Sequence, residues 1–141
     1  MTGRLFLVDD DPDDVMIFCE ALSEIDSSIA CDFEQDPRKA VTKIIERAIK
    51  PDIIFLDLNM PVFDGWQVLE AIKANAASRA IPVVIYSTLP LDRDIRRAKK
   101  LGASCYFSKP LDFIELRTNL RVVITAFNNG ELNQVSSHFQ Y

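Results

Sequence analysis

LFLVDDDPDDVM (residues 5–16) joins a short apolar run to a crowd of aspartates, and each half carries the signal of a different element. The apolar run, residues 5–8, shows no polar alternation, which is typical of a strand buried on both faces at the centre of a parallel sheet. After it, Asp11 suits a helix N-cap and Pro12 the first helical position, and the two aspartates that follow favour the positive end of the helix dipole. The stretch therefore predicts a buried strand followed at once by a helix.

The same order of strand and helix recurs along the rest of the chain. Two more runs are apolar throughout and two alternate with polar residues, and we expect strands there, at 53–56 and 83–86 for the former and at 29–34 and 104–108 for the latter. Apolar residues at helical spacing predict helices in the segments 15–22, 41–48, 68–72, 91–101 and 113–127. Five such units predict an α/β fold, a doubly wound (βα)5 parallel sheet with the flavodoxin-like strand order 2-1-3-4-5, in which the two alternating runs form the edges.

Length and composition limit what the chain can be. It has 141 residues, 48% of them hydrophobic, and a net charge of −5, which fits one globular domain and argues against a nucleic-acid surface. We place the domain at residues 1–127 and a polar tail at 128–141, and we expect no membrane span and no signal peptide. Because Cys19, Cys31 and Cys105 show no metal-ligand spacing, we expect unpaired core cysteines in a reducing, cytoplasmic compartment.

Polar side chains follow the predicted strands at the points where these strands end. Because parallel strands share one carboxyl edge, where such sheets bind their ligands, these side chains are expected to converge. The set comprises two aspartates after the first strand, one after the third, two hydroxyls after the fourth and a lysine after the fifth: Asp9, Asp10, Asp57, Ser87, Thr88 and Lys109. No single member is informative, but their convergence predicts a functional site at this edge.

The three aspartates of this set, Asp9, Asp10 and Asp57, would repel one another unless cations relieved the repulsion. Lys109 offers one positive charge, and a divalent ion would add the two that make the cluster neutral. Because the ligands are oxygens, without His or Cys, we expect Mg²⁺, with Mn²⁺ or Ca²⁺ as substitutes.

Four stretches of the chain together resemble one known family: LVDDDPDD (7–14), IIFLDLNMPVFDGWQVL (53–69), PVVIYSTLP (82–90) and GASCYFSKP (102–110). In order and spacing they are similar to the receiver domain of bacterial two-component response regulators, over about residues 4–127. The first two stretches look most like stand-alone receivers, such as those paired with phytochrome kinases.

The resemblance implies a role for each member of the acidic cluster. Asp57 matches the aspartate that accepts a phosphoryl group from a kinase histidine, and it also contacts the metal. Asp10 matches the direct Mg²⁺ ligand, Asp9 its acidic neighbour, and Asn59 the position whose backbone carbonyl completes the protein ligands. The chain would catalyse its own phosphorylation and dephosphorylation, so we do not expect an enzyme that acts on other substrates.

The resemblance also implies a switch. Ser87 matches the switch hydroxyl, with Thr88 as an alternative, and Lys109 matches the lysine that pairs with the phosphoryl group. Tyr106 matches the aromatic side chain that turns inward on activation, and the bond between Lys109 and Pro110 is cis in the family. The surface expected to change on phosphorylation is formed by the fourth helix, the fifth strand and the fifth helix.

The implied partners are a sensor histidine kinase or a histidine phosphotransfer protein as donor, and an unidentified downstream protein as reader. A homodimer is an open alternative, and neither nucleic acid nor a membrane is expected.

Two other functions stay open. A haloacid-dehalogenase-like phosphatase also uses a strand-end aspartate, a lysine and Mg²⁺, but it needs a second aspartate where this chain has Asn59. A pseudo-receiver folds without being phosphorylated, yet no site residue is missing here.

Overall fold

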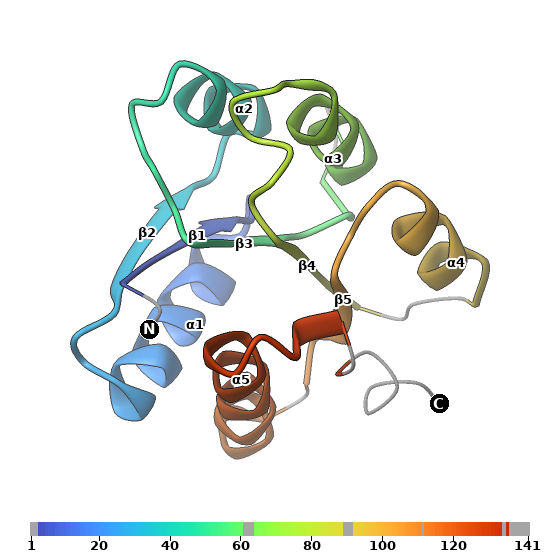
Figure 1. Ribbon diagram of the computed structural model, residues 1–141. Coiled ribbons are helices and arrows are strands. Elements are labelled where there is room, and N and C mark those ends of the chain that lie inside the picture. Colours follow the sequence, from blue (N-terminus) through green and yellow to red (C-terminus); the bar gives the residue numbers. More distant parts are fainter. Residues whose placement is uncertain (1–2, 61–63, 89–91, 111, 134, 136–141) are drawn as a thin grey trace.

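Five parallel strands form one sheet in the computed structural model (Figure 1). The structure describes residues 3–60, 64–88, 92–110, 112–133 and 135. The strands are β1 (Arg4–Val8), β2 (Ala30–Glu34), β3 (Ile53–Leu56), β4 (Val83–Ser87) and β5 (Cys105–Ser108). Their order is β2-β1-β3-β4-β5, and every neighbouring pair is parallel. The predicted flavodoxin-like order, with β2 and β5 at the edges, is confirmed.

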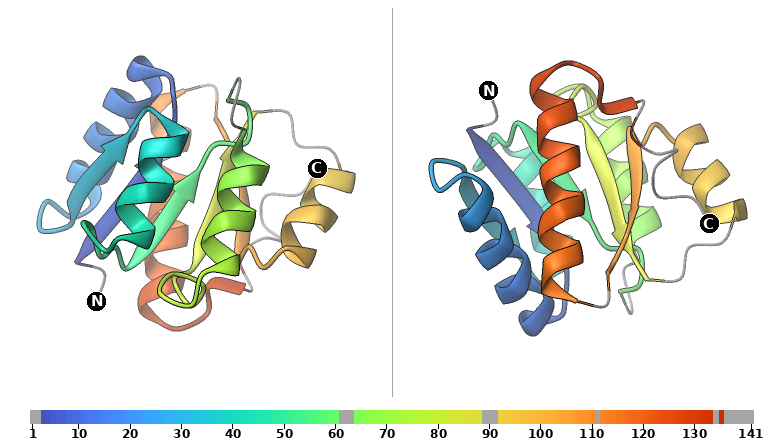
Figure 2. Two further views of the ribbon diagram at one scale, coloured as in Figure 1. Left: turned by 90° about the horizontal axis from the view of Figure 1, so that it is seen from above. Right: turned by 90° about the horizontal axis from the view of Figure 1, so that it is seen from below.

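Helices cover both faces of this sheet (Figures 1 and 2). They are α1 (Pro12–Ile25), α2 (Pro37–Ile45), α3 (Gly65–Ala74), α4 (Asp92–Lys100) and α5 (Phe113–Asn128). α1 and α5 pack on one face, and α2, α3 and α4 contribute to the core on the other. None of these described helices is long and apolar enough to cross a membrane.

β1 shows how the apolar runs build this core. Leu5 and Leu7 belong to the cluster that lies under α1 and α5, whereas Phe6 and Val8 belong to the cluster under α2 and α3. All four side chains are at most 1% exposed. The strand is therefore buried on both faces, as the absence of polar alternation predicted.

Helix caps fix where the chain turns at the carboxyl edge of the sheet. The Asp11 side chain accepts hydrogen bonds from the backbone N–H groups of the two aspartates that follow Pro12, and α1 begins at Pro12 as predicted. Asp36 caps α2 in the same way, with Pro37 at its first position. The predicted start of the fourth helix at residue 91 lies outside the described residues. The caps place the first turn of α1 immediately beside the end of β1.

The cysteines differ from the expectation. Cys19 in α1 and Cys31 in β2 form a disulfide with Cα atoms 5.9 Å apart, whereas the sequence led us to expect free thiols at both positions. Pairing depends on how α1 packs against β2, and a separation of 12 residues along the chain does not reveal that distance. Cys105 is a free buried thiol as expected, and burial raises its pKa to about 12.

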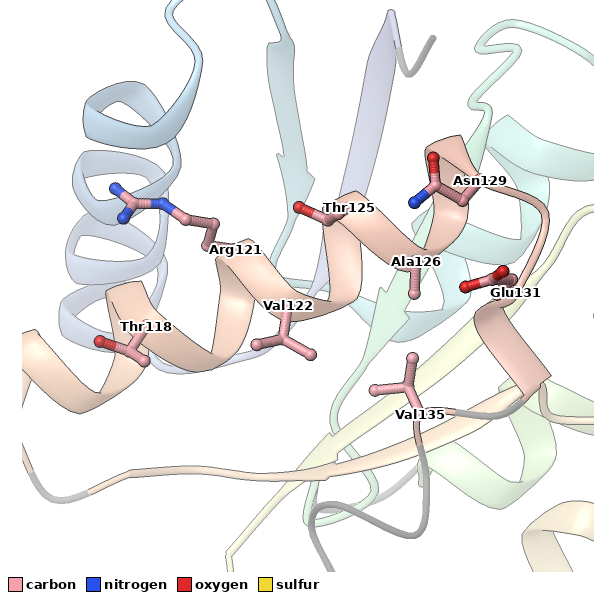
Figure 3. Close-up of a pocket in the computed structure, with 8 residues that line it drawn as sticks. All are labelled: Thr118, Arg121, Val122, Thr125, Ala126, Asn129, Glu131 and Val135. Carbon is pink, nitrogen blue, oxygen red and sulfur yellow. The ribbon is translucent and has the colours of Figure 1, made fainter.

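The described residues after α5 include two that pack on the domain, whereas we expected a polar tail from residue 128 onward. The chain turns at Gly130, whose φ is +73°, and Leu132 and Val135 are then 7% and 4% exposed. Both belong to the core cluster that lies under α1 and α5. Val135 and α5 enclose a groove of about 470 Å³ (Figure 3). Two isolated apolar residues among polar ones gave no periodic signal, and residues 134 and 136–141 of the expected tail lie outside the described part.

Candidate functional site

Three carboxylates meet at the carboxyl edge of the sheet. β1 and β3 pair in parallel with Val8 opposite Leu56, so that the aspartates that follow these strands lie side by side. One carboxylate oxygen from each of Asp9, Asp10 and Asp57 lies within 4.8 Å of the others. The structure thus brings together the predicted acidic cluster.

Lys109 reaches this cluster from the end of β5. Its backbone N–H donates to the Ser87 carbonyl oxygen at 2.8 Å, which places the lysine beside the end of β4. Its Nζ donates to Asp9 at 2.8 Å and to Asp57 at 3.2 Å. It also donates to Asp14 at 2.8 Å. The contacts to Asp9 and Asp57 fit the predicted convergence, but the contact to Asp14 was not predicted.

Sequence reasoning missed Asp14 because the helix dipole already accounted for it. It is the third residue of α1, and a carboxylate there is favourable whether or not it touches anything. The available signal was its place in the first turn of a helix that begins at the functional edge of the sheet. Tyr86 was missed for a similar reason, since it ends a buried run. Its ring centroid lies 5.1 Å from the Lys109 ammonium nitrogen.

Burial and charge act against each other in the cluster. Asp9 has no exposed surface, and burial raises its pKa to about 6, although its hydrogen bonds with Lys109 and with the Asp11 backbone oppose the change. The pKa of Asp10 is raised mainly by burial and to a smaller extent by repulsion from Asp57. Burial alone would lower the pKa of Lys109, but hydrogen bonds to Asp14 and Asp9 and the charge of Asp57 raise it instead.

The site has the donor chemistry of a divalent cation centre. Its three clustered side chains offer only carboxylate oxygens, which suit Mg²⁺, Mn²⁺ or Ca²⁺ and not the softer metals. Among the described residues, the Lys109 ammonium supplies the one positive charge in contact with Asp9 and Asp57, and Asp14 shares it. An excess of negative charge therefore remains, and a divalent ion would relieve it. The cluster fits the metal that the sequence led us to expect.

Asn59 contributes hydrogen bonds from its side chain as well as from its backbone. Its backbone N–H donates to the Asp57 carboxylate at 3.0 Å. Its side-chain amide donates to the Ser87 hydroxyl at 2.8 Å and to the Thr88 hydroxyl at 3.2 Å. One residue thus joins the acidic loop after β3 to both hydroxyls at the end of β4. The coordination of a metal by its backbone carbonyl stays a prediction.

Two further residues of the predicted switch are found in defined positions. Tyr106 is 4% exposed and lies in the core under α2, α3 and α4, so its side chain is on the inside. The expected cis bond between Lys109 and Pro110 is not found, because the described residues contain no cis peptide bond. The trans form is the more stable isomer of an X–Pro bond, and Lys109 reaches all three carboxylates with it.

Gly65, the first residue of α3, holds the loop that carries Asp57. A Cβ atom at this position would lie 2.2 Å from the Asp57 carbonyl oxygen and 2.5 Å from the Leu58 Cα. The Gly65 backbone N–H donates to the Leu58 carbonyl oxygen at 3.3 Å. The absence of a side chain therefore lets α3 pack directly against the backbone of the acidic loop.

Two grooves bear on the site, one along α5 and one beside Lys109. The larger one, shown in Figure 3, runs along α5 between Thr118 and Asn129 and none of the acidic cluster lines it. A smaller groove of about 280 Å³ opens beside Lys109, Asp14 and Tyr86. The smaller groove reaches Lys109, which contacts the cluster, and Asp10 is itself partly exposed.

A parallel sheet of this order, with an acidic cluster and a lysine at its carboxyl edge, is the arrangement expected of the receiver domains that the sequence resembles. The family model described as the response regulator receiver domain matches residues 5–121. The chain therefore belongs to the receiver domain family of two-component response regulators.

Individual relatives agree with this assignment. Response regulator Rcp1 of Synechocystis sp. is 37% identical over 71 residues, which cover 50% of this chain and 48% of that protein. The probable methanogenesis regulatory protein FilR2 of Methanothrix harundinacea is 40% identical over 73 residues, 52% of this chain and 47% of that protein. The chain thus spans about half the length of these curated relatives.

Solved structures extend the likeness to the whole fold. The phosphorylated cyanobacterial phytochrome response regulator RcpA has a TM-score of 0.82 and 27% identity, covering 92% of this chain and 96% of that chain. The Mn²⁺-bound form of Rcp1 has a TM-score of 0.74 and 27% identity, covering 87% and 92%. One neighbour is therefore described as phosphorylated and the other as bound to a divalent metal ion.

Proposed function

We propose that this chain is a single-domain response regulator in which Asp57 accepts a phosphoryl group in a Mg²⁺-dependent reaction. The observation that carries the proposal is the position of Asp57. It is buried, its carboxylate lies beside those of Asp9 and Asp10, and it accepts a hydrogen bond from the Lys109 ammonium at 3.2 Å. Action as a single domain is supported by the match to 96% of the RcpA chain. The donor is a sensor histidine kinase or a histidine phosphotransfer protein, and a phytochrome-type kinase fits the likeness to RcpA.

The transfer step follows from the residues around Asp57. A carboxylate oxygen of Asp57 attacks the phosphorus, an O–P bond forms, and the N–P bond to the donor histidine breaks, with its electron pair staying on the imidazole. A carboxylate is a poor nucleophile towards an anionic group, so positive charge must offset the repulsion. Lys109 supplies one such charge, and a bound divalent cation would supply further charge beside the transferring oxygens. Asp9 and Asp10, with Asp57 and the Asn59 carbonyl, would hold that ion.

The signalling step uses the hydroxyls of Ser87 and Thr88 at the end of β4. Phosphorylation adds oxygen acceptors beside Asp57. Ser87 already lies in the same hydrogen-bond network through Asn59, and it would turn its hydroxyl towards the phosphoryl group, with Thr88 as the alternative. Together with the inward Tyr106, this movement would change the surface of α4, β5 and α5, which a downstream protein or a second copy of the chain reads. The protein would act as a phosphoacceptor and not as an enzyme on other substrates.

The experiment that tests the proposal is intact mass spectrometry after incubation with acetyl phosphate, with and without Mg²⁺. One phosphoryl group is expected on the wild type with Mg²⁺, and none on Asp57→Asn, whose side chain has nearly the same shape. Addition to Asp57→Asn would contradict the assignment of the acceptor, and no addition to the wild type would favour a pseudo-receiver.

The proposal includes a cytoplasmic location, in which the disulfide between Cys19 and Cys31 would be open to reduction.

A further inference from the structure

The Lys109 ammonium has no donor to spare. A lysine has three N–H donors, and in this structure three carboxylates accept from it, those of Asp9, Asp14 and Asp57. The two shorter contacts, both 2.8 Å, are to Asp9 and Asp14, and the contact to Asp57 is 3.2 Å. The ammonium is therefore drawn towards the α1 side of the site. A phosphoryl group at Asp57 must compete with these carboxylates for it.

The three carboxylates differ in how readily each can give up the lysine. The Asp9 side chain is fully buried, and its other oxygen accepts from the Asp11 backbone N–H, so it cannot take up water. Asp57 is itself the proposed acceptor and is only 5% exposed. The Asp14 side chain is 36% exposed and lines the 280 Å³ groove that opens beside Lys109. Asp14 is the partner that water can replace at low cost.

The backbone of Asp14 stays in place whether or not the contact is made. α1 is held at its start by the Asp11 cap, and Val15 and Phe18 in the same helix are buried in the core. The Lys109 side chain is only 10% exposed, and its ammonium nitrogen lies 5.1 Å from the centroid of the Tyr86 ring. Exchange between Asp14 and a phosphoryl group therefore requires only a small shift of the Lys109 ammonium.

We propose that Asp14 is a positioning residue that holds the Lys109 ammonium on the α1 side of the site and so competes with the phosphoryl group on Asp57 for it. The inference rests on the proposed function and adds a residue to it. Asp14 lowers the affinity of the site for the phosphoryl group by giving Lys109 a partner before phosphorylation. Loss of its charge strengthens that affinity, because Lys109 is then free to move towards Asp57.

The test is the affinity for beryllofluoride, a phosphoryl-group mimic, at saturating Mg²⁺, followed by fluorine NMR of the bound mimic. Asp14→Asn is expected to bind it about two- to fivefold more tightly than the wild type, the range typical of an ion pair that water reaches from one side. Asp14→Glu keeps a carboxylate at the same position beside Lys109, and it is expected to retain wild-type affinity.

Asp13→Asn is the matched control, because it removes the same charge from the neighbouring exposed position of the same helical turn. If Asp13→Asn tightens binding as much as Asp14→Asn does, the effect is long-range electrostatics and the inference is wrong. It is equally wrong if Asp14→Asn binds the mimic no more tightly than the wild type, since Asp14 then orients Lys109 for the phosphoryl group or plays no part. Failure of the wild type to bind the mimic would instead overturn the proposed function, and the inference with it.

Discussion

Asp9 directly follows β1 and has no exposed surface, and its carboxylate accepts from Lys109 and lies close to that of Asp57. In the unfolded chain its pKa takes the ordinary value of 3.8, and in the folded protein burial raises it to about 6. The folded state therefore holds more protons between these two pH values, and the stability of the metal-free protein falls as the pH rises through this window. Above about pH 6 Asp9 is ionised in the folded protein, and burial of its charge lowers the free energy of unfolding by the full amount.

Asp9→Asn removes this cost, and we expect it to stabilise the metal-free protein at pH 8. The pKa difference of about two units sets an upper limit of about 3 kcal/mol, and the lost contact to Lys109 reduces the gain to about 1–2 kcal/mol. At pH 4.5 the gain is expected to be much smaller, because Asp9 is then protonated in the folded state. Urea denaturation in EDTA at both pH values measures the difference.

Mg²⁺ provides the control for this prediction. The wild type is expected to gain stability when Mg²⁺ is added at pH 8, whereas Asp9→Asn should gain less, because it has lost a carboxylate of the cluster. An equal gain from the substitution at pH 8 and pH 4.5 would mean that charge burial at Asp9 is not the cause.

Single residues also show how far the sequence alone determines the site. Asp57, Lys109 and the pair after β1 could be placed correctly, because a parallel sheet brings its carboxyl ends to one edge. Asp14 could not, since a helix dipole explains an aspartate in a first turn without any partner. The hydrogen bonds of the Asn59 side chain depend on the rotamer of an exposed residue, which no spacing encodes.

At the scale of elements, strand type and strand order were predictable and lateral contacts were not. Unbroken apolar runs predicted the central strands β1, β3 and β4, and alternation predicted the edges. The disulfide between Cys19 and Cys31 joins a helix to an edge strand, and only the packed structure gives their separation. The close approach of α3 to the acidic loop was likewise unpredictable from the sequence, because it depends on the distance between two backbone segments in the packed structure.

Gly65→Ala is expected to disturb the junction between α3 and the acidic loop. The added methyl group would meet the Asp57 carbonyl oxygen and the Leu58 Cα, which are backbone atoms and cannot turn away as a side chain could. We expect a loss of about 1–3 kcal/mol in the free energy of unfolding, as for other overpacked sites. Because the displaced backbone is that of Asp57, phosphorylation by acetyl phosphate should also slow.

Gly130→Ala separates the local effect from a general one. Gly130 has a φ of +73° and no atom within 4 Å of an added Cβ, so alanine there strains the backbone without a clash. This variant is expected to lose roughly 1 kcal/mol of stability and to keep the phosphorylation rate of the wild type. Unfolding curves and the rate of mass addition give both quantities, and equal slowing in the two variants would contradict a specific role for Gly65.

At the scale of the molecule, the packed structure extends beyond the matched family region. The family match ends at residue 121, yet the core cluster under α1 and α5 includes Leu132 and Val135. The turn after α5 is fixed by backbone bonds, with Glu131 N–H donating to the Ala126 carbonyl oxygen at 2.8 Å. The sequence did not reveal this packing, because two apolar residues in a polar stretch have no periodicity. The segment therefore contributes to the stability of the domain.

Leu132→Ala tests this contribution. Leu132 is 7% exposed, and loss of its buried side chain is expected to lower the free energy of unfolding by about 2–3 kcal/mol, at the lower end for a buried leucine because the site lies at the margin of the core. Asn133→Ala changes the adjacent exposed residue and is expected to alter stability by less than about 0.5 kcal/mol. Both are measured by urea denaturation at one pH. If the two substitutions cost the same, the segment after α5 adds nothing to the core, and the domain ends with the helix.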